Sequence, residues 1–287
     1  MKRNSLWILL ASLMLALPVQ ATDAGDNAAA LQQVLAARSA EDRARDSARH
    51  PAETLAFFQV APGMTVAEVL PGSGWYTKIL ANYLGPKGTL YGINYNDRMW
   101  GLFPNASEDW IAQRKAATGN FPDLVKSFTD NGIKAKGFTF NTVPHELAGT
   151  IDRVLLIRAM HNLSRFQEAA GTRSQALASI RSMLKPDGLV GVVQHRMPAT
   201  DETSGTAGST GYLVEADVIL AFEEAGFELV ATSEINANPL DQPGPEDIVW
   251  RLPPSLSTSK DDPELKAKME AIGESDRMTL LFRKSSS

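Results

Sequence analysis

The 287-residue chain contains no cysteine. Disulfides, thiolate metal sites, cysteine nucleophiles and iron–sulfur clusters are therefore excluded, and an oxidising compartment is tolerated but not exploited. The chain also lacks a block of lysine or arginine, and its formal net charge is −5. A mildly acidic chain without a basic patch argues against nucleic acid as the main partner. Three histidines, His145, His161 and His195, could be read as metal ligands, but no H-x-H or H-E-x-x-H spacing is present, so we expect no metal site.

No apolar run is long enough to span a membrane. The strongest candidate, Leu6–Leu17, is only about a dozen residues long; it follows a short basic start and precedes the small residue Ala21. This pattern is typical of a secretory signal peptide, residues 1–21, and a retained N-terminal anchor is the alternative. No cysteine follows the apolar run, which excludes a lipoprotein anchor. We expect a periplasmic protein without stable membrane insertion after cleavage.

Cleavage after Ala21 leaves 266 residues (287 minus 21) with a net charge of −7 (26 basic minus 33 acidic residues, since Lys2 and Arg3 are removed). This length suits one large α/β domain or two small ones. We find no internal repeat and no domain linker, because the Ser/Thr/Gly-rich segment 200–210 is short enough to be a flexible loop. We therefore predict a single domain over 22–287 with a helical extension at 22–60.

Apolar and helical patterns alternate along the chain. The runs predicted as strands are 64–70, 89–94, 138–140, 151–157, 189–194, 227–233 and 278–283. The helical patterns between them include 173–184 and 213–225, and residues 236–275, rich in Pro, Asp and Ser, are predicted as a long excursion. Alternation of this kind predicts a parallel sheet with helices on both faces.

The most specific pattern lies where the first predicted strand ends. There the sequence runs Glu68-Val69-Leu70-Pro71-Gly72-Ser73-Gly74 and continues at once into an amphipathic segment. A strand that passes through a G-x-G turn into a helix presents backbone N–H groups to an anionic or polar ligand. The full dinucleotide fingerprint requires a third glycine, and Thr77 occupies that position. The turn is therefore more typical of a nucleoside site than of a pyrophosphate cradle.

Two further motifs follow this turn in order. Arg158 to Leu163 (R-A-M-H-N-L) ends the fourth predicted strand, and Leu184 to Gly188 (L-K-P-D-G) precedes the fifth. The set resembles the class I S-adenosylmethionine-dependent methyltransferases. With the R-x-P entry at Arg49 and the pair Asn238-Pro239, the chain is similar in more detail to a group of secreted bacterial predicted methyltransferases, over roughly residues 45–285.

The resemblance implies a Rossmann-like, doubly wound seven-stranded sheet of order 3-2-1-4-5-7-6 with the last strand antiparallel. It also implies S-adenosylmethionine as cofactor and a small molecule as methyl acceptor. The residues it places against the cofactor around the turn are Glu68, Pro71, Gly72, Ser73, Gly74 and Tyr76. A tight turn without a ligand is the alternative, since glycine is common in turns.

Asn94 is the main departure from this family. The superfamily usually carries a carboxylate at the end of the second strand, which accepts both ribose hydroxyls. The amide of Asn94 can accept one hydroxyl and donate to the other, so ribose contact stays open beside a plain strand-end cap. Asp97 could substitute if the loop bends back.

His161 and His195 follow the fourth and fifth predicted strands, at the edge where open α/β sheets place their ligands. His161 could take a proton from an acceptor as a general base, or it could simply cap the following helix. With Arg158 and Arg196, the two histidines would form a cationic, titratable rim.

Three more side chains carry open alternatives. Arg158 could bind a substrate carboxylate, but an ion pair with Glu146 or Asp152 is the favoured interpretation. Trp75 and Tyr76 begin the helix after the glycine turn. They could cover the cofactor sulfonium or an aromatic substrate, or pack against the N-terminal helices.

Two functions from different classes remain. The first is a periplasmic methyltransferase. The second is a protein that binds a nucleoside or metabolite on the same fold without chemistry, because S-adenosylmethionine is made in the cytosol and Asn94 weakens the ribose site. A different reaction on this fold is a third, weaker interpretation.

Overall fold

The computed structural model describes residues 20–200 and 207–286. The predicted signal peptide, residues 1–21, therefore lies outside the described residues except for its last two positions, where the first helix already begins. Most of the predicted loop at 200–210 also lies outside them.

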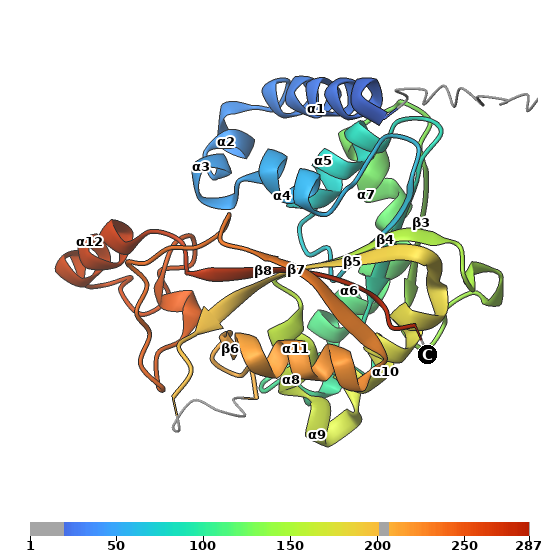
Figure 1. Ribbon diagram of the computed structural model, residues 1–287. Coiled ribbons are helices and arrows are strands. Elements are labelled where there is room, and N and C mark those ends of the chain that lie inside the picture. The colour runs from blue at the N-terminus through green and yellow to red at the C-terminus, as the bar shows by residue number, and fades with distance from the viewer. Residues whose placement is uncertain (1–19, 201–206, 287) are drawn as a thin grey trace, which may run out of the picture.

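A central mixed sheet organises the structure (Figure 1). Its strands are β1 (Thr65–Val69), β2 (Thr89–Asn94), β3 (Lys134–Thr139), β4 (Ile151–Ile157), β5 (Leu184–Met197), β6 (Leu213–Val214), β7 (Phe227–Ser233) and β8 (Arg277–Lys284). The order across the sheet is β3-β2-β1-β4-β5-β8-β7, with the short β6 paired to β5 off this path. Without β6 the order reads 3-2-1-4-5-7-6, which confirms the predicted topology. The last strand, β8, runs antiparallel to both of its neighbours, as expected.

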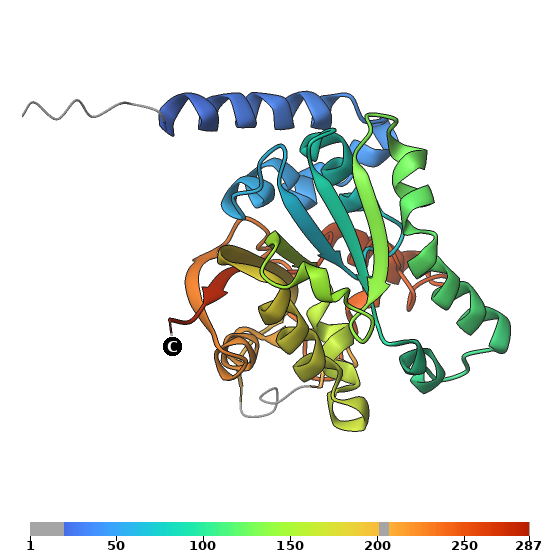
Figure 2. The ribbon, with the colours of Figure 1, turned by 90° about the vertical axis from the view of Figure 1, so that its right-hand side faces the viewer.

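Helices cover both faces of the sheet. They are α1 (Gln20–Ala36), α2 (Ala40–Arg43), α3 (Asp46–Arg49), α4 (Pro51–Phe57), α5 (Trp75–Leu84), α6 (Glu108–Gly119), α7 (Phe121–Phe128), α8 (Met160–Arg165), α9 (Gln167–Ala170), α10 (Thr172–Met183), α11 (Glu215–Glu224) and α12 (Pro263–Ile272). Three short 3-10 helices are η1 (Asp97–Leu102), η2 (His145–Leu147) and η3 (Val249–Arg251). Figure 2 shows α1 lying across one end of the molecule, where it packs on α4 and α5.

Alternation along the strands divides the core into two layers. On β1, Val66 packs with α4 and α5, whereas Ala67 and Val69 face the opposite layer with α8 and α10. The same alternation on β4 sends Val154 and Leu155 to different layers. Because successive side chains of a strand point to opposite faces, a strand buried on both faces has a continuous apolar run. Glu68 lies on the face of Val66, toward α5.

The register aligns the carboxyl ends of the central strands. Val69 of β1 pairs with Ile93 of β2, and the backbone N–H of Leu70 donates to the Ile93 carbonyl over 2.8 Å. On the other side, Ile157 of β4 pairs with Val193 of β5. The residues that follow β1, β2, β4 and β5 therefore meet at one edge of the sheet, where α/β folds of this kind bind ligands.

Several predicted bounds were wrong. The third strand, predicted at 138–140, is β3 at Lys134–Thr139. Leu213 and Val214 form β6 instead of starting the helix, because they pair with Arg196 and Met197. The L-K-P-D-G motif is part of β5: Ile151 pairs with Leu184 and Arg153 with Leu189, so the extra residues form a bulge. The excursion between β7 and β8 is not wholly irregular, since it contains η3 and α12.

Candidate functional site

The turn after β1 holds three residues with left-handed backbone: Leu70 (φ +52°), Gly72 (φ +60°) and Gly74 (φ +84°). Leu70 is the unusual member, because a non-glycine residue in this region is strained and such strain gathers at functional sites. A Cβ on Gly72 would approach only the Leu70 carbonyl, at 3.9 Å. A Cβ on Gly74 would lie 2.9 Å from the Phe128 ring. The first glycine thus leaves space open, whereas the second makes room for a packed side chain.

Two cavities meet at this turn. One has a volume of about 640 Å³ and the other about 310 Å³. The residues common to both linings are Leu70, Pro71, Gly72 and Asn162. The glycine turn therefore forms part of the wall between two adjoining compartments.

The larger cavity has an aromatic wall. Its lining includes Asn94 at the end of β2 and, beyond it, Tyr95, Trp100, Phe103 and Trp110. Tyr95 and Trp100 pack edge to face with ring centroids 5.0 Å apart. The Oδ1 atom of Asn94 accepts a hydrogen bond from the Tyr95 backbone N–H over 3.2 Å. An apolar cleft with a few polar groups is the usual form of a small-molecule site.

The smaller cavity gathers the polar side chains. Most of the residues predicted from the sequence line it, namely Glu68, Pro71, Gly72, Ser73, Tyr76, His161 and His195. Asn94 lines the larger cavity, and Gly74 lines neither of the two. The fold therefore brings together predicted site residues that lie up to 127 positions apart in the chain (68 to 195).

Glu68 is buried under this cavity and its Oε2 accepts a hydrogen bond from Thr77 Oγ1 over 2.6 Å. Burial raises the pKa of Glu68 to about 8, against the opposing effects of the Thr77 hydroxyl and the Arg158 charge. The carboxyl is thus mostly protonated at neutral pH. A cationic group beside it would restore the carboxylate.

The ring of His161 is oriented by Gln194. The Gln194 amide nitrogen donates to the carbonyls of His195 (3.1 Å) and Gly211 (2.8 Å), so its Oε1 must be the atom that faces His161. That oxygen lies 3.1 Å from His161 Nδ1 and accepts from the His161 backbone N–H over 3.2 Å. Since an amide oxygen only accepts, Nδ1 carries the proton and Nε2 holds the lone pair.

Neither histidine titrates near neutral pH. Burial lowers the pKa of His161 to about 4, and it lowers the pKa of His195 well below its usual value, helped by the Arg158 charge. His195 Nδ1 lies 2.5 Å from Ser275 Oγ, and the two imidazole centroids are 5.4 Å apart. The expectation of a titratable rim was therefore wrong, because both rings are desolvated and face arginines. Both are held neutral, the form that accepts a proton.

The favoured pairing of Arg158 was also wrong. Asp152 instead binds Lys185 (2.6 Å) and the backbone of Thr65. Arg158 follows β4 with φ +58°, lines the smaller cavity and is partly exposed toward it. Its Nε is buried without a hydrogen-bond partner among the described residues. Burial lowers its pKa to about 10, so it stays charged at neutral pH.

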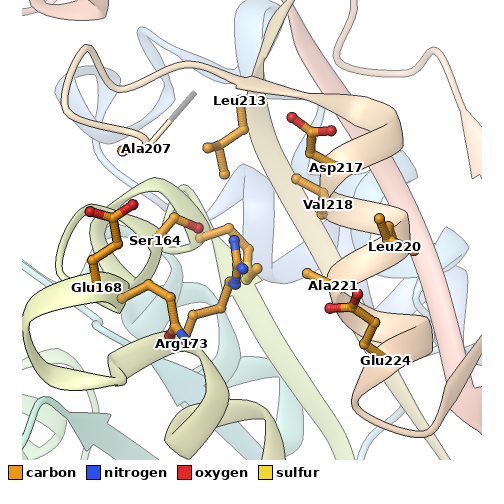
Figure 3. Close-up of a pocket in the computed structure, with 12 residues that line it drawn as sticks. Ser164, Glu168, Arg173, Ala207, Leu213, Asp217, Val218, Leu220, Ala221 and Glu224 are labelled. Atoms are coloured by element: carbon orange, nitrogen blue, oxygen red, sulfur yellow. The ribbon is translucent and has the colours of Figure 1, made fainter. Parts of the chain in front are cut away.

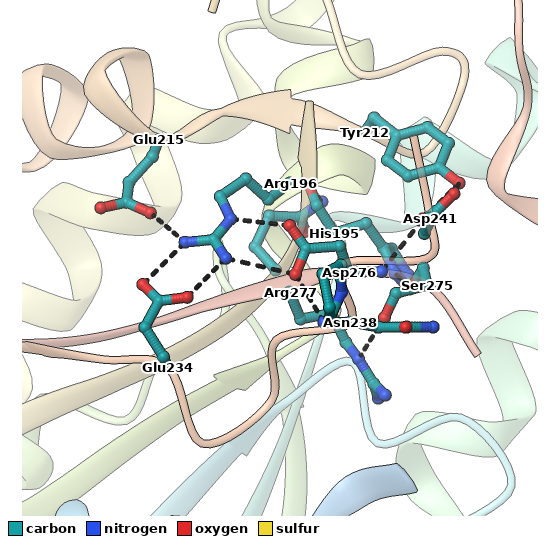
Figure 4. Close-up of polar contacts among 12 residues, drawn as sticks. His195, Arg196, Tyr212, Glu215, Glu234, Asn238, Asp241, Ser275, Asp276 and Arg277 are labelled. Carbon is teal, nitrogen blue, oxygen red and sulfur yellow. Dashed lines mark hydrogen bonds and ion pairs between the residues drawn. The ribbon is translucent and has the colours of Figure 1, made fainter. Parts of the chain in front are cut away.

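Arg196 points away from the cavity. It forms ion pairs with Glu215, Glu234 and Asp276 at 3.1, 2.6 and 2.8 Å, and Figure 4 shows its guanidinium enclosed by these carboxylates. Asp276 also accepts from the backbone N–H of Asn238. The network fastens the excursion between β7 and β8 to the end of β5.

That excursion contributes Trp250, which lines the smaller cavity and packs edge to face on His161 at 6.1 Å. No local sequence signal indicates this contact. Gln194 was missed for the same reason, since a glutamine inside an apolar strand carries no motif. The aromatic wall of the larger cavity also carries no motif that identifies it in the sequence.

Trp75 and Tyr76 pack against the N-terminal helices. The guanidinium groups of Arg38 and Arg49 lie over the Trp75 ring, 5.3 and 4.8 Å from its centroid, and the Tyr76 hydroxyl donates to the Arg49 carbonyl over 3.3 Å. Trp75 Nε1 donates to the Asp42 carbonyl. Both residues also border the smaller cavity, so they connect its wall to the N-terminal helices.

Within residues 20–200 and 207–286, no group of three or more His, Asp or Glu side chains is placed to hold a metal ion. In the same residues, no helix combines the length and apolarity that a membrane span needs.

Comparison with known proteins identifies the fold but no close relative. No protein-family model matches the chain, and no curated protein matches it. Among solved structures, the [4+2]-cyclase SpnF is similar with a TM-score of 0.52 and 13% identity, over 83% of this chain and 82% of that one. A chain from the Haloferax volcanii complex of the Trm112 methyltransferase activator with a candidate methyltransferase has a TM-score of 0.50 and 17% identity, over 93% and 97%.

A SAM-dependent methyltransferase from Aquifex aeolicus is similar over 72% of this chain and 93% of that one, with 19% identity and a TM-score of 0.47. Identities this low show a shared fold and nothing more. The chain has the methyltransferase-like Rossmann fold, with the strand order and antiparallel strand given above.

Proposed function

We propose that this protein is an S-adenosylmethionine-dependent methyltransferase acting on a small molecule in the periplasm. The observation that carries the proposal is the position of the glycine turn between two adjoining cavities at the carboxyl edge of the sheet. One cavity is aromatic and begins at Asn94; the other is polar and holds Glu68, Arg158 and His161. S-adenosylmethionine consists of a nucleoside, which suits the aromatic cavity, joined to an amino acid, which suits the polar one.

The residues present fit such a cofactor. Asn94 and the aromatic wall would hold the nucleoside half, and Gly72, which has open space on its Cβ side, would let it cross the turn. Glu68 would pair with the amino group, regaining the charge that burial alone removes. When bound, the cofactor supplies an activated methyl group on a sulfonium.

The protein's own part is orientation and proton handling. His161 presents a neutral imidazole with Nε2 as acceptor, so it can take a proton from a hydroxyl or amine. Trp250 and Tyr76 line the same cavity, where their rings would exclude water from a bound ligand. Holding the reacting groups in place in a dry pocket is the main means of catalysing a displacement of this type.

Calorimetry with S-adenosylmethionine and S-adenosylhomocysteine tests the cofactor. We expect a dissociation constant on the order of micromolar, and its loss in Gly72→Asp, which places a carboxylate in the open space between the cavities. Gly149→Asp is the matched control, because Gly149 also has positive φ (+65°) and open space, but precedes β4 at the opposite edge of the sheet. No binding at about millimolar cofactor by the unchanged protein would rule out the proposal.

The second function is a nucleoside- or metabolite-binding protein without catalysis. Asn94 supports it, because an amide that already accepts from the Tyr95 N–H has less capacity for a ribose than a carboxylate has. Incubation of the protein with cofactor and extracted metabolites separates the two. Formation of S-adenosylhomocysteine supports the enzyme, whereas cofactor binding with none formed supports the binding protein.

The location is tested separately. Residues 1–21 are proposed to direct export and to be removed. N-terminal sequencing of the protein recovered from the periplasm should then begin at Thr22. Recovery of the uncleaved chain from the cytosol would contradict the location without affecting the cofactor test.

A further inference from the structure

Three guanidinium groups gather at the smaller cavity, those of Arg49, Arg158 and Arg277, and one carboxylate binds two of them. Arg49 Nε donates to both carboxylate oxygens of Glu274 (3.1 and 3.0 Å), and Arg277 Nη1 donates to Glu274 Oε2 (3.2 Å). Arg49 and Arg277 are only 2% and 3% exposed. The third, Arg158, has no ion pair among the described residues and is the one that lines the cavity. A buried charge of this kind is costly unless a counter-charge is present.

The other charged groups nearby do not supply that counter-charge. Arg38 pairs with Asp46, and Lys78 pairs with Asp42, so these two pairs are neutral. Asp276 also acts on the charge of Arg277, but it is held with Glu215 and Glu234 around Arg196 and does not line the smaller cavity. These contacts leave Arg158 facing the cavity beside the neutral rings of His161 and His195.

Glu68 does not change this balance. Its carboxyl lines the same cavity as Arg158 and is affected by the Arg158 charge, yet burial keeps it mostly protonated. The three guanidinium groups and the Glu274 carboxylate, counted by themselves, therefore have a net charge of +2 (3 minus 1). An electropositive cavity with an incompletely bonded guanidinium selects oxyanions, since the planar fork of arginine matches a carboxylate.

We propose that the methyl acceptor is a small organic acid whose carboxylate binds the guanidinium of Arg158 in the cavity bordered by Trp250. This inference rests on the proposed methyltransferase function. The apolar and aromatic part of the lining, Ile157, Trp250 and Tyr76, would contact the body of the acid.

The cofactor itself does not remove the need for an anion. Its amino-acid half brings one carboxylate and one ammonium, and its sulfonium adds a further positive charge, so the whole is a cation. If Glu68 ionises against the ammonium, the cavity with cofactor remains positively charged. An acceptor with a carboxylate is then the complementary second ligand.

A third cavity, about 320 Å³, provides the contrast. It lies between α8 and α11, and Figure 3 shows Glu168 and Glu224 on opposite sides of it. These residues give two carboxyl groups against one arginine, Arg173. An organic acid is disfavoured there by like charge, so the two cavities differ in the ligands they select.

Calorimetry with matched pairs of an acid and its amide tests the proposal. Acetate and benzoate are titrated against acetamide and benzamide, with the purified protein saturated with S-adenosylhomocysteine. We expect at least one acid to bind about tenfold or more tightly than its amide. Arg158→Gln should abolish this preference, and Arg158→Lys should restore only part of it, because lysine keeps the charge without the fork. Inorganic phosphate should bind more weakly than the acid.

Arg173→Gln is the matched control, since it removes an arginine from a different cavity. It should retain the preference for the acid. Circular dichroism and the melting temperature establish that each variant is folded. If Arg158→Gln is not folded, the acid preference of Arg158→Lys is compared with that of the unchanged protein instead.

Three outcomes would overturn the proposal: equal affinity for acid and amide, no acid bound at about 50 mM, or a preference that persists without Arg158. A fourth outcome assigns Arg158 to the cofactor and overturns it too. In that case Arg158→Gln weakens the binding of S-adenosylhomocysteine but not the binding of 5′-methylthioadenosine, which lacks the carboxylate. Failure of the unchanged protein to bind S-adenosylhomocysteine, with the acid preference intact, would instead overturn the proposed function and support the anion site.

Discussion

Nδ1 of His161 lies 3.1 Å from Oε1 of Gln194, and the amide nitrogen of Gln194 is committed to the carbonyls of His195 and Gly211. Gln194 is fully buried inside β5, so this orientation cannot be exchanged for a hydrogen bond to water. Gln194 is thus a positioning residue: it fixes which nitrogen of His161 carries the proton.

The first prediction concerns that tautomer. Nitrogen-edited NMR should show His161 neutral at pH 7, with the proton on Nδ1 and a pKa of about 4. Gln194→Glu should raise that pKa toward or above its ordinary value of about 6.5, because a carboxylate stabilises the charged ring. The signal is assigned from the spectrum of His161→Asn. A proton on Nε2 in the unchanged protein would contradict the hydrogen-bond network described here.

The second prediction concerns acid stability. A histidine whose folded pKa is depressed binds a proton in the unfolded state first, so stability falls as pH falls below about 6.5. For His161, with a folded pKa of about 4, the loss between pH 7 and pH 5 is about 2 kcal/mol. His195 adds to it in the same direction.

Urea unfolding at the two pH values measures this loss. In His161→Asn the dependence on pH should be shallower, since one titrating group is gone. A slope unchanged by that substitution would show that His161 is not held neutral by burial.

The third prediction concerns Glu68. Its folded pKa of about 8 lies above the unfolded value of about 4.5, so the native state keeps a proton that the unfolded state has lost. Stability from this group is therefore present at low pH and decreases as pH rises from about 4.5 to about 8. Glu68→Gln should stabilise the protein at pH 8 by on the order of 1–3 kcal/mol and should weaken cofactor binding.

Thr77→Val is the companion variant, because it removes the 2.6 Å hydrogen bond and leaves the carboxyl in place. It should not raise stability. If Glu68→Gln were destabilising at pH 8, the carboxyl would have to be ionised and paired in the free protein.

The fourth prediction compares two glycines of one turn. Gly72→Ala costs only left-handed backbone strain, about 1 kcal/mol, because its Cβ meets nothing closer than 3.9 Å. Gly74→Ala adds a Cβ at 2.9 Å from the Phe128 ring and should cost about 2–4 kcal/mol. The loss of cofactor affinity should have the opposite order. Gly72→Ala should lose more affinity than Gly74→Ala, although it loses less stability. Equal stability losses would contradict the packing role of Gly74.

Local pattern located the strands well. Residues 89–94, 151–157 and 227–233 are strands with the predicted bounds. For 151–157 the reason is its mostly apolar run, which is buried as a central strand of the sheet. The order of the strands came from the resemblance, since pairing between distant segments leaves no trace in periodicity. Leu213 is an example of what local pattern misses. Its surroundings predict a helix, but it forms a short strand paired with β5, and no local sequence signal indicates that pairing.

The candidate site divides in the same way. The motifs alone predicted the glycine turn, Glu68, His161 and His195 as residues of one sheet edge, since ligands of α/β folds collect where parallel strands end. The charge states and partners of these residues follow from the tertiary structure. Burial makes both histidines neutral and protonates Glu68, the pairing of Asp152 with Lys185 leaves Arg158 to the cavity, and the anchored excursion adds Trp250. Desolvation and ion pairing depend on what surrounds a group in space, and neighbours distant along the chain are set only by the fold.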